Sequence, residues 1–219
     1  MNLYIIRHGE SKWNIENRIQ GSSDPGLSKL GRLQAKLLAG RFKKIKIDMI
    51  YSSPLLRSMQ TARELSKVLR LGIIKRSGLR EVMLGEWEEK TPQEIDKLYN
   101  NKYQKWLRYG PTKIRIPGQE KISNFRKRAA KAFHRIIKEN KNRENVIVVT
   151  HGGVISSYLA GLLGADFNKT ILKLHLPNTC VTLVSFEKEK GCIRHIACIK
   201  HDRHKRFVKR RTDKGTRRP

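Results

Sequence analysis

Two histidines in this chain each come directly after a strand-like apolar run and directly before a glycine. His8 lies in the segment Arg-His-Gly-Glu at 7–10, and His151 lies in Thr-His-Gly-Gly at 150–153. A glycine at such a place lets the backbone turn sharply and come close to a ligand that a Cβ would obstruct. Two histidines that leave two strand ends in this way indicate a phosphoryl-transfer site built around a histidine nucleophile.

Two arginines are expected to bind the phosphate group of a phosphomonoester. Arg7 and Arg57 carry planar, permanently charged guanidinium groups, whose paired N–H donors suit phosphate oxygens. Arg57 follows Ser53 and Pro54, a cap residue and a first-turn proline, and this pair predicts a helix that begins at Pro54. The free N–H groups and the dipole at that helix end would also favour an anion.

The two histidines are expected to have different roles. His8, when neutral, can attack phosphorus through a ring nitrogen and form a phosphohistidine, and the neighbouring cations disfavour its protonated form. His151 can donate a hydrogen bond to a phosphoryl oxygen and stabilise the charge that spreads onto the equatorial oxygens.

The leaving alkoxide needs a proton, and Glu81 is the candidate donor. It lies in an irregular segment that is able to fold over the site. An apolar wall beside a bound dianion would favour its protonated form, as a general acid requires. In a second step the same group would act as the base for the water that hydrolyses the phosphohistidine. Three neighbouring carboxylates compete for this role: Glu86, Glu88 and Glu89.

The apolar pattern of the chain alternates between strands and helices. Strands are expected at 2–7, 47–51, from 73, 146–149, 171–176, 180–186 and 192–199, and helices at about 29–43, 54–70, 121–140 and 154–163, with short helical stretches around 92–108. This order favours an α/β fold, a three-layer α/β/α sandwich with a mostly parallel central sheet. Ligands of such sheets bind beyond the carboxyl ends of the strands, where His8, Arg57 and His151 would meet.

Four motifs, in their order along the chain, resemble those of the histidine phosphatase (phosphoglycerate mutase-like) superfamily. They are Arg-His-Gly-Glu-Ser at 7–11 with an asparagine at 14, Ser-Ser-Pro-x-x-Arg at 52–57, Glu at 81 with Gly-x-Trp-Glu at 85–88, and Thr-His-Gly-Gly at 150–153. The resemblance covers about residues 2–187. It implies that His8 is phosphorylated and that Glu81 donates the proton, with neither a metal ion nor a cofactor. It implies phosphate-binding roles for Arg7, Asn14, Gln20, Gly21, Arg57 and His151.

Two places depart from the family pattern, and neither removes a reacting group. The family usually has Trp-Glu-Gly where this chain has Trp-Glu-Glu at 87–89, and often Asp-x-Pro-Leu where this chain has Asp-Pro-Gly-Leu at 24–27. The segment between Trp87 and His151 is shorter than the insertion that closes the site of the family's mutases, so water is expected to reach the phosphohistidine. A compact phosphatase is therefore expected, and a phosphoglycerate mutase-type transferase is the alternative.

The formal net charge of +29 is spread along the whole chain. Such a charge attracts phosphorylated substrates and also favours non-specific contact with nucleic acid. The expected partner is a small phosphorylated metabolite. A basic polyanion- or RNA-binding protein on the same fold is a second alternative, which ranks lower because the chain keeps every reacting residue. A monomer and a homodimer both remain open.

The composition and the lengths of the apolar runs also predict the domain organisation and the cellular compartment of the protein. Residues 1–200 are expected to form one domain with a short lid-like insertion at about 88–120, and the basic segment 201–219 is expected to be a disordered tail. Apolar runs are too short for a membrane span or a signal peptide, so a cytoplasmic protein is expected. Three cysteines without a Cys-x-x-Cys pair argue against a disulfide framework or a zinc site.

Overall fold

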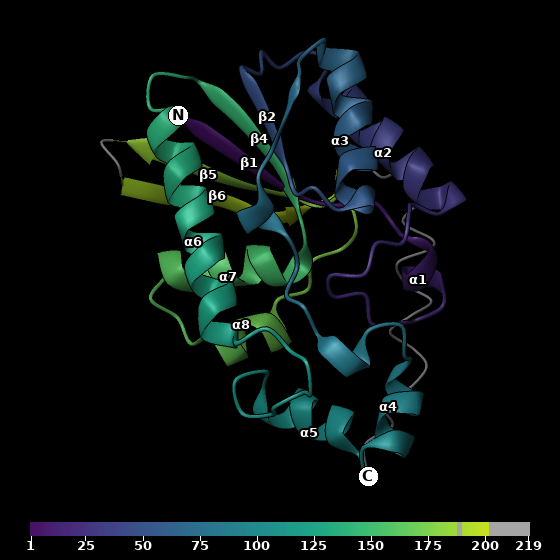
Figure 1. The fold of residues 1–219 in the computed structure, drawn as a ribbon. Coiled ribbons are helices and arrows are strands. Elements are labelled where there is room, and N and C mark those ends of the chain that lie inside the picture. Colours follow the sequence, from purple (N-terminus) through teal and green to yellow (C-terminus); the bar gives the residue numbers. More distant parts are fainter. Residues whose placement is uncertain (188–189, 202–219) are drawn as a thin grey trace.

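A computed structural model describes residues 1–187 and 190–201, and within them six strands form one sheet (Figure 1). The strands are β1 (Asn2–Arg7), β2 (Met49–Ser52), β3 (Ile73–Lys75), β4 (Asn145–Thr150), β5 (Val181–Glu187) and β6 (Lys190–Cys198). Their order in the sheet is β3-β2-β4-β1-β5-β6. The pairs among the first four are parallel, whereas β5 and β6 are antiparallel to their neighbours.

Helices cover both faces of this sheet, as the α/β sandwich requires. They are α1 (Lys12–Ile15), α2 (Lys29–Phe42), α3 (Leu56–Leu69), α4 (Pro92–Leu98), α5 (Lys102–Tyr109), α6 (Ile122–Glu139), α7 (Gly152–Leu162) and α8 (Phe167–Lys173). Figure 1 shows α2 and α3 on one side of the sheet and α6 and α7 on the other, with α4 and α5 away from both layers. The expected three-layer α/β/α fold is confirmed.

Alternate residues of the central strands explain the two layers. Ile6 of β1 and Ile147 and Val149 of β4 belong to the buried cluster that contains α2 and α3. Their neighbours Ile5 and Val148 belong to the cluster that contains α6 and α7. Successive strand residues point to opposite faces, so a strand covered on both sides must be apolar throughout. The continuous apolar run expected for the strand at 146–149 has this cause.

The prediction of a strand at 171–176 is wrong. The chain forms α8 from Phe167 to Lys173 instead, because Asp166 caps the helix by accepting a hydrogen bond from Lys169 N at 2.8 Å. Phe167 and Ile171, four residues apart, then pack against the same hydrophobic cluster. The alternation of apolar residues in this segment resembled a strand, but the cap and the helical spacing decide the outcome.

The helix expected from Pro54 begins two residues later, at Leu56. Leu55 is its N-cap residue and makes no side-chain cap hydrogen bond. Ser53, expected to be the cap, accepts a hydrogen bond from Leu55 N at 3.3 Å, and its hydroxyl lies 2.8 Å from His151 Nε2. This serine is therefore part of the site and not the cap of α3.

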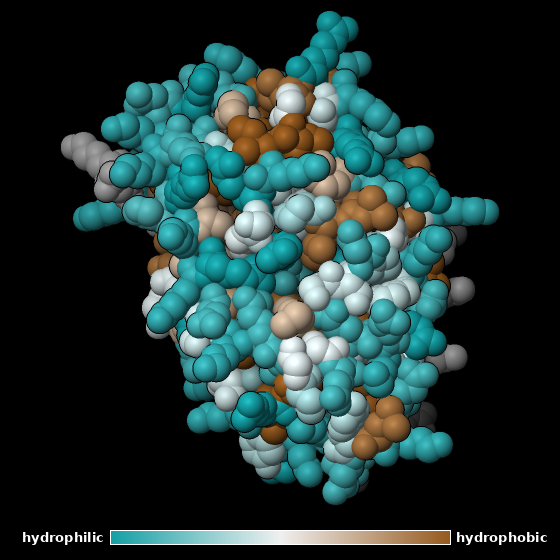
Figure 2. Space-filling model, in the orientation of Figure 1, coloured by the Kyte–Doolittle hydropathy of each residue, from teal (hydrophilic) through white to brown (hydrophobic). Residues whose placement is uncertain are grey.

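Hydrophilic residues cover most of the face seen in Figure 2, and hydrophobic residues there form separate groups. This agrees with the high formal charge of the chain. Within residues 1–187 and 190–201, no helix combines the length and the apolar character that crossing a bilayer requires. The tail expected at 201–219 lies outside the described residues, except for His201.

Glu89 stands where the family usually has glycine, and its backbone is left-handed with φ of 72°. This conformation disfavours any residue with a Cβ by about 1–2 kcal/mol. Part of the gain from a glycine is offset by its greater entropy in the unfolded chain. We expect Glu89→Gly to raise the free energy of unfolding by roughly 0.5–1 kcal/mol, measured by urea denaturation.

A glutamate in a regular helix provides the matched control for this substitution. Glu64→Gly, in the middle of α3, should lower the free energy of unfolding by about 1 kcal/mol. A destabilisation of similar size at both positions would contradict the account of Glu89.

Candidate active site

Three neighbouring strands end at the same edge of the sheet and bring the predicted residues together. Arg7, the last residue of β1, is paired in register with Thr150, the last residue of β4. His8 and His151 therefore leave the sheet side by side, and their ring centroids are 5.2 Å apart. The adjacent strand β2 leads through Ser53 to Arg57, the second residue of α3.

A cavity of about 410 Å³ opens at this edge. Six of the predicted site residues line it: Arg7, His8, Gln20, Gly21, Arg57 and Glu81. His151 is fully buried beside His8. Asn14 is not among the residues that line the cavity; its side chain accepts a hydrogen bond from Ser11 N at 3.0 Å, and Ser11 Oγ lies 2.8 Å from Gln20 Oε1. The structure therefore gathers seven of the eight predicted residues at the cavity and places Asn14 next to its wall.

His8 is held in the form that a nucleophile needs. Its Nδ1 lies 2.7 Å from Gly9 O, and because a carbonyl can only accept, Nδ1 carries the hydrogen. Nε2 then keeps its lone pair. Burial, and after it the charges of Arg57 and Arg7, lowers the pKa of His8 well below the ordinary histidine value of 6.5. The ring is therefore neutral at neutral pH.

His151 is oriented by two serine hydroxyls. Its Nε2 lies 2.8 Å from Ser53 Oγ and 3.3 Å from Ser58 Oγ, whereas Nδ1 is buried without a hydrogen-bond partner in the described part of the chain. Burial, followed by the charge of Arg57, lowers the pKa of His151 well below 6.5. The sequence interpretation did not assign Ser53 and Ser58 to the site, although both flank Arg57 at the same strand end.

Both arginines are anchored by backbone carbonyls. Arg57 donates from Nη1 to Ser23 O at 2.7 Å and from Nη2 to Gly21 O at 2.8 Å, and Arg7 donates from Nη1 to Leu176 O. The Nε atoms of both arginines are buried without a partner among the described residues. Burial lowers the pKa of Arg57 to about 10, so it is still a cation at neutral pH. Carbonyl anchors fix the direction of these cations, and neither arginine forms an ion pair with a carboxylate in the described part of the chain.

Three buried nitrogens of these residues, from three chain segments, have no hydrogen-bond partner among the described residues: Arg7 Nε, Arg57 Nε and His151 Nδ1. Other buried donors in this part of the chain, such as Arg76 Nε and Trp87 Nε1, also lack a partner there, but these three belong to residues close enough together that the charges of Arg57 and Arg7 act on both histidines. Two permanent cations and a histidine beside a neutral His8 form a site suited to a phosphate dianion.

Glu81 borders the same cavity. Its Oε2 accepts from Gly153 N at 3.0 Å, at the start of α7, and its Oε1 accepts from Val82 N at 3.1 Å. The three other carboxylates in this segment do not line the cavity: Glu86, Glu88 and Glu89. Of the four, Glu81 alone has the position that a proton donor requires.

Glu88 has a different task, which the sequence did not reveal. Its carboxylate accepts from Ser22 N at 2.8 Å, Ser23 N at 2.9 Å and Leu84 N at 2.8 Å, and both serine hydroxyls also contact it. A Cβ on Gly21 would lie 2.1 Å from Glu88 Oε1, so this approach requires glycine. Glu88 thereby holds the loop whose carbonyls anchor Arg57.

We expect Glu88→Gln to weaken phosphate binding at the site. A glutamine amide would point N–H groups at donors that the carboxylate now accepts from. Hydrogen bonds to a charged group contribute about 1.5–3 kcal/mol, so kcat/KM should fall roughly 10- to 100-fold. The inhibition constant of inorganic phosphate, read in the same assay, should rise in parallel. Glu86→Gln is the matched control, because Glu86 bonds to Tyr99 Oη at 2.8 Å and should leave both constants near wild type. An unchanged phosphate constant in Glu88→Gln would contradict this role.

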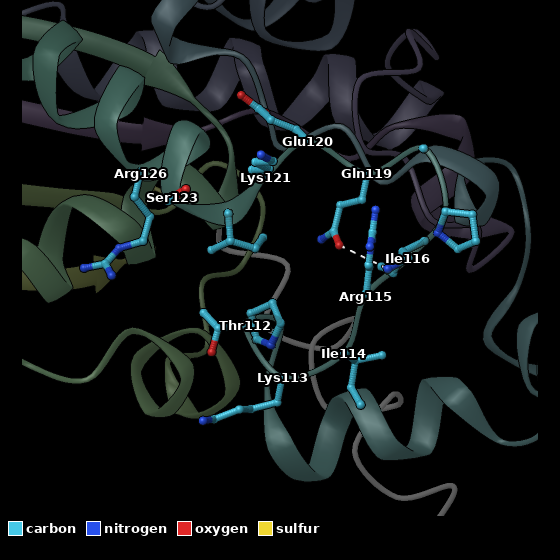
Figure 3. A pocket seen from close by; sticks show the side chains of 14 residues that line it. Thr112, Lys113, Ile114, Arg115, Ile116, Gln119, Glu120, Lys121, Ser123 and Arg126 are labelled. Carbon is cyan, nitrogen blue, oxygen red and sulfur yellow. Dashed lines mark hydrogen bonds between the residues drawn. The ribbon is translucent and has the colours of Figure 1, made fainter.

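A larger hollow of about 740 Å³ lies between the segment 111–120 and the start of α6 (Figure 3). In it Gln119 accepts from Ile116 N at 3.3 Å. None of the predicted site residues lines this hollow. Although it is larger than the cavity beside His8, it is not the place of the predicted chemistry.

The sequence matches the family described as Histidine phosphatase superfamily (branch 1) over residues 3–199. The chain belongs to this superfamily. Phosphoserine phosphatase 1 of Hydrogenobacter thermophilus is 31% identical, and the alignment covers 87% of this chain and 89% of that protein. Phosphoglycerate mutase-like protein 4 of Arabidopsis thaliana is 38% identical, with 71% of this chain and 68% of that protein covered.

A solved structure shows that this histidine phosphatase also shares the fold of its relatives. A phosphoserine phosphatase mutant from Entamoeba histolytica, in complex with phosphoserine, superposes with a TM-score of 0.79 at 28% identity. The superposition covers 91% of this chain and 98% of that one. The resemblance inferred from the four motifs is confirmed.

Proposed function

We propose that this histidine phosphatase hydrolyses the phosphomonoester of a small metabolite through a phosphohistidine at His8, without a metal ion. The observation that carries the proposal is the neutral ring of His8, whose Nε2 keeps a lone pair, beside three buried nitrogens without partners among the described residues. A nucleophile and an anion-binding site then share one cavity.

In the first step, Arg7, Arg57 and His151 bind the phosphoryl oxygens, and His8 Nε2 attacks phosphorus. The bond between phosphorus and the leaving oxygen breaks while Glu81 donates its proton to that oxygen. Gln20, Gly21 and Asn14 complete the phosphate pocket in this proposal. Because the cations are anchored before substrate binds, little reorganisation accompanies the charge that spreads over the equatorial oxygens.

In the second step, the phosphohistidine is hydrolysed. Glu81, now ionised, takes a proton from water; the water oxygen attacks phosphorus, and the bond between phosphorus and His8 Nε2 breaks. Inorganic phosphate leaves, and Glu81 is again protonated for the next cycle. His8 returns to the neutral form that its surroundings favour.

The proposal treats residues 1–200 as the catalytic domain and about 88–120 as its lid-like insertion, from which Trp106 reaches the cavity. It places the enzyme in the cytoplasm, as a monomer or homodimer. The names of the relatives support a phosphorylated small metabolite as partner. The net charge supports weak, non-specific contact with nucleic acid.

A phosphate-release assay in EDTA on p-nitrophenyl phosphate and short alkyl phosphates tests the proposal, with isomerisation of 3-phosphoglycerate followed in parallel. Release should persist in EDTA, and a loss that a divalent ion restores would contradict the metal-free reaction. Isomerisation without release would make the protein a mutase. If the protein showed neither phosphate release nor isomerisation, and bound RNA with an affinity that falls as the salt concentration rises, the polyanion-binding alternative would be favoured.

A further inference from the structure

Beyond the groups that bind phosphate, the cavity is lined mainly by apolar side chains. They come from four separate segments: Ile19, Val82, Leu84, Trp106, Ile171, Leu174 and Leu176. We propose that the preferred substrate has an uncharged, apolar or aromatic leaving group and carries no ammonium. This inference rests on the proposed phosphatase function, because it assigns the remaining cavity to the alcohol part of the ester.

The charges around the cavity oppose an ammonium group. Glu81 is the single carboxylate among the described residues that line it, and its two oxygens already accept from Gly153 N and Val82 N. Arg7 and Arg57 lie in the same cavity. The only side-chain carboxylate among the described lining residues that could pair with an ammonium is therefore Glu81, which the proposed mechanism protonates, so the cost of removing the ammonium from water is not repaid by an ionised side chain.

Arg18 and His175, which also line the cavity, do not offer a built site for a second anion. Arg18 forms ion pairs with Glu16 at 3.0 Å and Glu94 at 3.3 Å, and it donates to Glu89 O at 2.6 Å. Its charge is therefore compensated by neighbours. His175 is exposed and belongs to the segment that follows α8.

Trp106 gives the apolar part of the cavity a flat wall. Its ring stacks on Tyr103 with centroids 5.9 Å apart and planes inclined by 13°. Tyr103 in turn lies 5.9 Å from the buried ring of Trp87. This row of aromatic rings holds Trp106 in place, and an indole wall of this kind suits aromatic or extended aliphatic groups.

Propyl phosphate and phosphoethanolamine test the inference, because they have nearly the same size and differ at one terminal group, methyl or ammonium. The ammonium makes ethanolamine the better leaving group, so chemistry alone would favour phosphoethanolamine. We expect kcat/KM to be about tenfold or more higher for propyl phosphate, a difference of at least about 1.4 kcal/mol. 3-Phenylpropyl phosphate should be hydrolysed with a higher kcat/KM still.

Two outcomes would overturn the inference in different ways. A preference for phosphoethanolamine or phosphoserine, with p-nitrophenyl phosphate hydrolysed in a reaction that needs His8, would overturn the substrate class and leave the phosphatase function standing. Failure to hydrolyse any of these esters would overturn both.

Substitutions in the wall separate a specificity role from a structural one. Trp106→Ala should lower kcat/KM for 3-phenylpropyl phosphate about tenfold and change that for propyl phosphate by less than about twofold. Tyr109→Ala is the control, because Tyr109 lies on the same helix, half exposed, and does not line the cavity.

Leu174→Glu, which supplies a carboxylate, should raise the ratio of kcat/KM for phosphoethanolamine to kcat/KM for propyl phosphate. Equal losses on both apolar esters in Trp106→Ala, or an unchanged ratio in Leu174→Glu, would contradict the assignment.

Discussion

Replacing His8 with alanine should lower phosphate release from every phosphomonoester by about 10⁴-fold or more, because no other group described at the site takes over as nucleophile. Its neighbours support this expectation. His151 Nε2 is held by Ser53 and Ser58, and the ring is fully buried. The measurement is kcat/KM for p-nitrophenyl phosphate in EDTA.

His134→Ala is the matched control for this variant, since His134 is exposed on α6 and should keep wild-type activity. Thermal unfolding of both variants checks that the fold survives. Activity of His8→Ala within about tenfold of wild type would mean that the reaction does not pass through His8.

Replacing Glu81 with glutamine should lower kcat/KM for alkyl phosphates by about 10²–10⁴-fold, because an amide cannot protonate the leaving alkoxide. p-Nitrophenolate hardly needs a proton, so kcat/KM for p-nitrophenyl phosphate should fall much less. This constant reports the steps up to formation of the phosphoenzyme, so the base role of Glu81 in the second step does not disturb the comparison. The substitution keeps the size of the side chain, and the hydrogen bond that its amide loses with Gly153 N or Val82 N lowers both constants alike, so the difference between the two substrates reports the proton donor.

Glu86→Gln, in the same segment but outside the cavity, should leave both substrates near wild type. If Glu81→Gln lost the same factor on alkyl and p-nitrophenyl phosphates, Glu81 would not be the proton donor.

The fold follows from sequence patterns that act locally. The apolar runs at 2–7 and 146–149 indicate buried strands, and the strand ends place His8 and His151 at one edge of the sheet. The segment 171–176 shows the limit of this reasoning. Its alternating apolar residues fit a strand, but the cap at Asp166 and tertiary packing of Phe167 and Ile171 favour a helix.

The finer geometry of the site depends on contacts between distant segments, and the sequence pattern carries no signal for them. Glu88 holds the loop at 21–23, and that loop anchors Arg57 through two carbonyls. Ser53 has the pattern of a helix cap, yet it orients His151, which lies 98 positions away. Such contacts follow from the path of the loops after the sheet has formed.

The character of the cavity wall is likewise a property of the folded chain. Ile19, Leu84, Trp106 and Leu174 belong to four segments, and each reads as an ordinary packing residue in its own context. Together they form an apolar surface beside the phosphate-binding cations. The substrate class could be inferred only from this assembly.

Trapping the phosphoenzyme tests the central claim most directly. Glu81→Gln should form a phosphohistidine from p-nitrophenyl phosphate, which needs no proton donor, and should hydrolyse it slowly because the base is missing. Rapid quenching in alkali and peptide mass spectrometry should then find an acid-labile phosphoryl group on His8, at Nε2. The double variant with His8→Ala should carry none. A phosphoryl group on another residue, or phosphate release without any covalent phosphoenzyme, would contradict the account.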